Sequence, residues 1–325
     1  MQPNSPQLDE HGFPVPPTFA GAADPRGRVG RIGRHAWRTA LVLVFMVLLG
    51  TAAVREGAVD WIKEALAQQL VRRAIAQAEQ DDLPGALANL DLAVAWAPNE
   101  PLFYKLRADF RLEMNDARGS LEDYNQLITL NDRYVPAYLG RSTALQRLNR
   151  HREAIDDLTR AIELSPGHDP MSRNNRAYAR AIAGIELDEG LVDVNEALKW
   201  VELQLKSIDA DPNNFNRIRF QAKVKEEKAM YLDTRGTLYL LKGMLNEAQH
   251  DLAEAIPLAE ESFHQLDEIQ GLARQPRWQR IRGHALAVMY HHRGQIHLML
   301  GNAAEAQIDL QRGQELGYNP AEGVY

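Results

Sequence analysis

The 325-residue sequence contains no cysteine, and it lacks the short motifs that mark the common enzyme classes. Without cysteine, disulfides, thiolate chemistry and cysteine-based zinc sites are excluded. The sequence has no GxxxxGK[ST] phosphate loop, no dinucleotide-binding GxGxxG, no HExxH zinc motif and no serine nucleophile elbow. It therefore predicts a protein that is not an enzyme and needs no cofactor.

Four histidines lie close together near the C-terminal end, and they are the only candidates for a metal site. His284 and His291 are seven residues apart and share one face of a helix. His297 is six residues beyond His291, which places it about 120° away around a helix. Three ligands do not converge in this arrangement, so we expect packing and surface histidines and no metal.

The net charge of −7 is distributed unevenly along the chain. Residues 1–54 carry five arginines and three acidic residues, so this part is +2 and the remainder is −9. An acidic remainder is a poor match for a phosphate backbone. We therefore expect no nucleic-acid partner.

Residues 1–35 form a basic segment rich in proline and glycine, with few apolar residues. Such a composition cannot bury a core, and it predicts a disordered tail. The stretch from Phe13 to Pro17 could adopt polyproline II and bind an aromatic groove, but a plain flexible tail is the favoured interpretation.

Residues 36–55 are predicted to form a transmembrane helix. Leu41 to Leu49 is an unbroken apolar run, and Trp37 and Arg38 suit a membrane interface. Arginines accumulate before the segment, so the N-terminus is expected in the cytoplasm and the rest of this single-pass membrane protein outside it. A cleaved signal peptide with small residues near Gly50 stays an alternative to the retained anchor.

The most regular stretch runs from Val135 to Pro166, and it repeats upstream with a fixed period. Small or apolar residues occupy three matched positions here and at one and two periods of 34 residues earlier: Ser142, Ala154 and Ala161; Ala108, Ser120 and Leu127; Ala74, Ala86 and Ala93. A period of 34 is typical of a helix–turn–helix solenoid. In this pattern the sequence resembles the tetratricopeptide repeat (TPR) family.

The resemblance implies an all-α, right-handed α-solenoid of about six TPR-like hairpins over residues 56–320, followed by a short tail at 321–325. Only small side chains fit where the two helices of a repeat approach most closely. Ala177, Gly236 and Gly294 take this place in the later repeats. The fourth repeat has one residue more than the pattern, which we expect in the turn around Gly184.

The spacing between small residues rises to 59 and 58 after Ala177, which predicts elongated helices in the last repeats. Two seams of apolar residues at helical spacing run through the additional sequence: Val194, Leu198, Val201, Leu205 and Ile208; Ala259, Phe263, Leu266, Ile269 and Ala273. Breaks are expected near Pro212 and Pro276, because proline stops a helix. Whether the elongated hairpins project or fold back onto the repeats is left open.

In TPR relatives the first helix of each repeat lines a concave groove. By the resemblance, Val71 and Ile75 would line it in the first repeat. The candidate partner-binding residues of the later repeats are Lys105, Asp109, Leu139, Thr143, Asn174, Tyr178, Asp233, Thr237, His291 and Gln295. An extended peptide or a partner helix could lie along such a row. The lysine–asparagine clamp of chaperone-tail-binding TPRs is absent, since Val71, Ile75 and Leu106 stand in its places.

The sequence favours a membrane-anchored TPR scaffold that mediates protein–protein interactions through its groove. One alternative is a structural protein that forms homo-oligomers through its elongated hairpins. Another is an accessory subunit of a membrane enzyme complex.

Overall fold

The computed structural model describes residues 59–165, 169–208, 215–270 and 276–319. Within these ranges the chain is helical and has no strand. The chain separates into two compact units, Met1–Val59 and Asp60–Tyr325, and the described helices belong to the second apart from their first residue. The predicted tails and the predicted transmembrane helix lie outside the described residues. Inside them, no helix combines the length and the apolar character that crossing a membrane requires.

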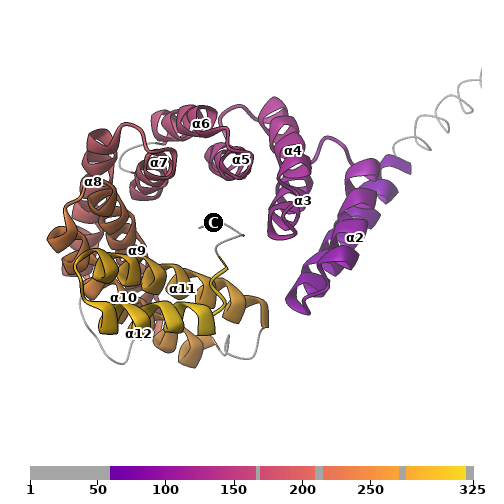
Figure 1. Cartoon of the computed structure of the whole chain (residues 1–325). Helices are drawn as coiled ribbons and strands as arrows, with labels where there is room; N and C mark the ends of the chain where they lie inside the picture. Colours follow the sequence, from indigo (N-terminus) through magenta and orange to yellow (C-terminus); the bar gives the residue numbers. More distant parts are fainter. Residues whose placement is uncertain (1–58, 166–168, 209–214, 271–275, 320–325) are drawn as a thin grey trace, which may run out of the picture. The chain divides into compact units, whose positions relative to one another are not determined.

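Twelve helices within the described residues form six consecutive hairpins, in agreement with the number of repeats expected from the sequence (Figure 1). The first helix spans residues 59–79, and the others are α2 (Leu83–Trp96), α3 (Pro101–Glu113), α4 (Ala117–Leu130), α5 (Val135–Arg147), α6 (His151–Leu164), α7 (Pro170–Ala183), α8 (Leu187–Ser207), α9 (Phe215–Leu241), α10 (Leu245–Gln270), α11 (Pro276–Met299) and α12 (Ala303–Glu315).

Each hairpin turns at the same position, seven residues after its small residue. The backbone there has a positive φ in every repeat: Asp81, Asn115, Asn149, Gly184, Gly243 and Gly301. Asparagine, aspartate and glycine are the residues that tolerate this left-handed conformation best. The fourth turn has a second positive φ at Glu186, so it accommodates the additional residue expected near Gly184.

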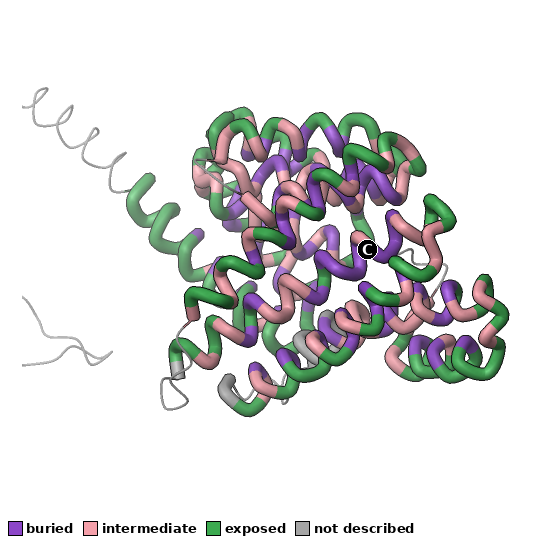
Figure 2. Tube along the Cα trace, turned by 90° about the vertical axis from the view of Figure 1, so that its left-hand side faces the viewer, coloured by how far each residue is buried: buried purple, intermediate pink, exposed green. Residues whose placement is uncertain are grey.

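The first helices of consecutive hairpins lie against one another. α3 contacts α5, α5 contacts α7, α7 contacts α9, and α9 contacts α11, whereas consecutive second helices make fewer contacts with each other. Figure 1 shows α5 and α7 on the inner side of α6 and α8. The first helices therefore form an inner surface, and Figure 2 shows that buried residues lie on the helix sides that face a neighbour.

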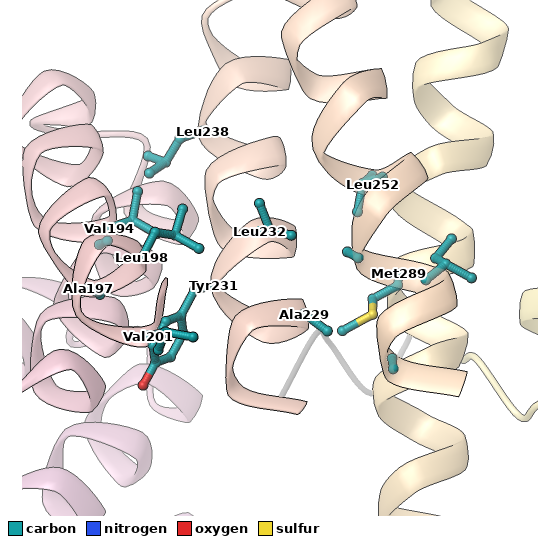
Figure 3. Close-up of a cluster of buried hydrophobic side chains, with 14 of the residues drawn as sticks. Val194, Ala197, Leu198, Val201, Ala229, Tyr231, Leu232, Leu238, Leu252 and Met289 are labelled. Carbon is teal, nitrogen blue, oxygen red and sulfur yellow. The ribbon is translucent and has the colours of Figure 1, made fainter. Parts of the chain in front are cut away.

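Helices α8 to α11 are longer than α2 to α7 and α12, as the wide spacing of the small residues predicted. They have 21, 27, 26 and 24 residues, whereas α5 has 13. Three residues of each seam are buried: Val194, Leu198 and Val201; Ala259, Phe263 and Leu266. Figure 3 shows those of the first seam beside Tyr231 and Leu238 of α9. Leu205 and Ile208 are partly buried, and Ala273 lies outside the described residues. The additional sequence of the last repeats is thus mainly helical where it is described, as predicted.

Ion pairs join the additional turns of these long helices to each other. Lys225 of α9 lies 2.8 Å from Glu261 of α10, and Arg282 of α11 pairs with Asp267 of α10. The side chains of Phe263 and Leu266 are buried in the same region. The long helices therefore bury apolar side chains against one another, and the largest hydrophobic cluster extends through them.

Gly140 of α5 lies where the third hairpin closely approaches the second, and its substitution tests this packing. A Cβ atom at this position would lie 2.0 Å from the ring of Tyr124, which is fully buried. Gly140→Ala should lower the free energy of unfolding by about 1–3 kcal/mol through overpacking, despite the better helix propensity of alanine. Gly283→Ala is the control, because its nearest neighbour is the Leu316 carbonyl at 3.6 Å. Chemical denaturation should show Gly283→Ala neutral or stabilising; equal effects would contradict this packing.

Candidate interaction surface

The inner surface carries the predicted groove residues, which occur three residues before and one residue after each small residue. The structure leaves seven of the ten at least partly exposed: Lys105, Asp109, Leu139, Thr143, Tyr178, His291 and Gln295. Asn174, Asp233 and Thr237 are each only 7% exposed. In the first repeat, Val71 is buried and Ile75 is exposed. A role of this row in partner binding stays a prediction.

Two of the groove residues form an ion pair on α3. Lys105 Nζ lies 2.7 Å from Asp109 Oδ2, one helical turn away, and both side chains are partly exposed. The hydroxyl of Tyr124 from α4 donates a hydrogen bond to the other oxygen of Asp109. Burial and the neighbouring Asp109 raise the pKa of Tyr124, so the hydroxyl stays protonated and keeps donating. Asp109 is thereby held in one position beside the inner surface.

Asp233 and Thr237 of α9 meet His292 of α11, the fourth histidine of the cluster considered above as a metal site. His292 Nδ1 lies 2.9 Å from Asp233 Oδ1 and 3.3 Å from the hydroxyl of Thr237. Burial alone would lower the pKa of His292, but the charge of Asp233 and its hydrogen bond outweigh burial and raise it. This ion pair joins the first helices of the fifth and sixth hairpins.

The neighbouring His291 contacts an aromatic ring near the C-terminal end of the described chain. His291 stacks on Tyr318 with ring centroids 3.9 Å apart, and burial followed by the neighbouring His292 lowers its pKa. Within the described residues, no group of three or more potential ligands is placed to hold a metal ion.

An arginine precedes the small residue in all six hairpins, and we call this series the arginine ladder: Arg73, Arg107, Arg141, Arg176, Arg235 and Arg293. From the second hairpin to the sixth, the guanidinium donates two parallel hydrogen bonds to an aspartate on the second helix of the same hairpin. The aspartates are Asp123, Asp157, Asp193, Asp251 and Asp309.

The third hairpin shows the geometry of one such pair. Arg141 Nε and Nη2 lie 2.8 and 2.6 Å from the two oxygens of Asp157, which is only 6% exposed. These hydrogen bonds raise the pKa of Arg141, and the guanidinium lies over the ring of Tyr138. A bidentate pair with a buried carboxylate fixes both the distance and the orientation of two helices.

The same arginines also reach back to the preceding hairpin through Nη1. Their acceptors occupy one repeat position, two residues after the preceding ladder aspartate or its equivalent: Asp91, Asn125, Thr159 and Asn195, at 2.9, 2.8, 3.1 and 2.9 Å. The ladder therefore connects the two helices of one hairpin and also joins consecutive hairpins.

The first hairpin departs from this arrangement. Asn89 takes the place of the aspartate, and its amide donates to Gln77 Oε1 at 2.6 Å. Arg73 is exposed and has no hydrogen bond or ion pair with another described residue. The ladder was not predicted, although its signal is present in the sequence: an arginine before each small residue, with an aspartate 16 or 17 residues later in five repeats.

Comparison with known proteins agrees with this geometry. Residues 135–168 match the family model described as "Tetratricopeptide repeat". These residues form a TPR. The match covers the third hairpin, which is the most regular by sequence, and the other hairpins share its turn position and its small residue. The described chain is thus a TPR-type scaffold of a kind suited to protein–protein interaction.

Similar proteins are related over limited lengths. Tetratricopeptide repeat protein 36 of Xenopus tropicalis is 31% identical over 104 residues, which are 30% of this chain and 50% of that protein. A DnaJ homolog subfamily C member 7 homolog of Dictyostelium discoideum is 21% identical over 162 residues, 46% of this chain and 29% of that protein. The chain therefore spans half or less of these curated relatives.

Among solved structures, a thermophilic TPR protein of Thermus thermophilus is similar, with a TM-score of 0.46 and 19% identity. The alignment covers 63% of this chain and 97% of that one.

Removing one partner of a ladder pair should destabilise the protein strongly. Asp157→Ala leaves the half-buried Arg141 without its carboxylate, and we expect a loss of about 3–5 kcal/mol in chemical denaturation. Glu163→Ala is the control, because Glu163 pairs with Arg160 at an exposed site on α6. That pair should contribute at most about 1 kcal/mol. Similar losses in the two variants would contradict a structural role for the ladder.

The pair of His292 with Asp233 should make stability depend on pH. Because the pKa of His292 is raised in the folded protein, its contribution is complete below the unfolded value of about 6.5 and is lost as pH rises through the folded value. The free energy of unfolding should therefore fall with rising pH above about 6.5. His292→Gln should flatten this slope, and the exposed His250→Gln should not. An unchanged slope in His292→Gln would disprove the assignment.

Proposed function

We propose that this protein is a membrane-anchored TPR scaffold that holds protein partners on the inner surface of its first helices. The observation that carries the proposal is the arginine ladder, which holds the first helices in place and leaves seven of the ten residues of the inner row at least partly exposed. Lys105, Leu139 and Thr143 contribute a positive charge, an aliphatic group and a hydroxyl to that row. Such a mixed, rigid surface suits an extended peptide or a helix.

The proposal includes no catalysis. The chain carries none of the enzyme motifs named above, and two side chains whose pKa values are perturbed have structural partners. Tyr124 is bound to Asp109, and His292 to Asp233. These contacts support a binding protein more than a reactive site.

The membrane anchor is proposed from the sequence of residues 36–55, which precede the described helices. The arginines before this segment favour a cytoplasmic N-terminus and an extracytoplasmic repeat domain. Oligomers formed by the elongated hairpins stay the alternative, although the buried seam residues of α8 to α11 already pack against neighbouring helices.

Affinity capture of the tagged full-length protein in mild detergent, followed by mass spectrometry, tests the proposal. Thr143→Arg should reduce recovery of a specific partner at least about tenfold, because it places a long cation in the inner row. Thr129→Arg is a matched control. Both hydroxyls donate to the carbonyl four residues earlier, but Thr129 lies exposed on the second helix α4. Equal recovery from both variants would show that partners do not use the inner surface.

A further inference from the structure

The first helix begins two turns before the repeat that it belongs to. The first helix of the second hairpin starts at Pro101, whose equivalent one period earlier is Ala67. Residues 59–66 therefore have no counterpart in the next hairpin, and all of them are exposed, as the green start of this helix in Figure 2 shows. They present large apolar side chains to solvent: Trp61 is 69% exposed, Ile62 49% and Leu66 41%.

These apolar residues gather on the side of the helix that faces away from the fold. The packed side is made by small and aliphatic residues: Ala67, Val71, Ala74 and Ala78. At 100° per residue, Ile62 and Leu66 lie more than about 90° from the middle of this packed side. Glu64 lies about 160° from Ile62, so the charged residues of these turns occupy another face. The extension is therefore an amphipathic helix whose apolar face has no partner among the described residues.

Two unpaired arginines continue this outward face. Arg72 and Arg73 lie one to two turns beyond Leu66 and are exposed, without a hydrogen bond or ion pair to any described residue. The ladder explains why Arg73 is available: no earlier hairpin in the described chain offers an acceptor, and Asn89 replaces the aspartate. The repeat region is otherwise acidic. Apolar residues with an exposed tryptophan, followed by arginines on the same face, are typical of a helix that lies at a membrane surface.

We propose that the outward face of the first helix lies on a lipid bilayer. Trp61, Ile62 and Leu66 would insert at the boundary between headgroups and acyl chains. Arg72 and Arg73 would bind headgroup phosphates. This inference rests on the proposed anchor, whose apolar segment ends only a few residues before the helix. That continuity holds the face next to a bilayer at high local concentration. A lipid surface therefore fits this face, because anionic headgroups complement the two arginines beside its apolar residues.

The experiment uses the full-length protein reconstituted into vesicles that contain phosphatidylglycerol. Because the natural chain has no cysteine, Ile62→Cys and Glu64→Cys each accept one environment-sensitive fluorophore. Brominated acyl chains should quench the label at residue 62 severalfold more than the label at 64. Both sites are equally close to the anchor, so tethering alone cannot produce this difference.

Charge reversal tests the arginines separately. Arg72→Glu with Arg73→Glu should abolish the excess quenching at residue 62, since the helix would be repelled from anionic headgroups. The control reverses two exposed arginines elsewhere, Arg118→Glu with Arg152→Glu, and should leave the quenching unchanged.

Flotation of the vesicles separates the two proposals. Protein that floats but shows equal quenching at 62 and 64 overturns the surface helix and leaves the anchor intact. A label at 62 that is shielded from both lipid and aqueous quenchers also overturns it, because protein would then cover the face. Protein that does not float refutes the anchor, and the inference with it.

Discussion

The bidentate pair between an arginine and a buried aspartate is the interaction on which the hairpins depend. In each of five hairpins a carboxylate is removed from water, and this is tolerable only because a guanidinium donates to both of its oxygens. The remaining nitrogen of the same guanidinium binds the preceding hairpin in four cases. One side chain thus sets the angle within a repeat and the spacing between repeats, so neither can change independently.

Much of the fold could be predicted from the sequence because its determinants are local. A small residue is required where two helices approach, and a residue that tolerates positive φ is required seven places later. Both positions recur even where the period stretches, as Gly236 and Gly243 show. The long helices were predictable for a similar reason, since apolar residues at helical spacing continue through the additional sequence. The additional residue in the fourth turn, where Glu186 has a positive φ, was predictable from the spacing of the small residues in that repeat.

The candidate site was less predictable, because burial depends on partners distant in the sequence. Counting from the small residue places Asp233 on the inner helix, but it does not reveal that His292, 59 residues later, covers it. The ladder was missed for a different reason. Its residues are charged, and charged residues at helical spacing usually indicate solvated faces. Only the recurrence of the arginine and the aspartate at fixed positions distinguishes them from surface charges.

The position of a residue in the array decides its role as much as its chemistry does. Arg141 and Arg73 occupy the same place in their repeats, yet Arg141 is bound by Asp157 and Asn125, whereas Arg73 has neither partner. Because Asn89 stands where the other hairpins have an aspartate, Arg73 has no carboxylate partner within its own hairpin. Because the described chain has no earlier hairpin, Arg73 also has no acceptor in a preceding one. A structural cation in five hairpins thereby becomes a surface cation in the first, beside an apolar face that the repeats do not use. The first described hairpin therefore exposes a residue that the same repeat pattern uses internally in the later hairpins.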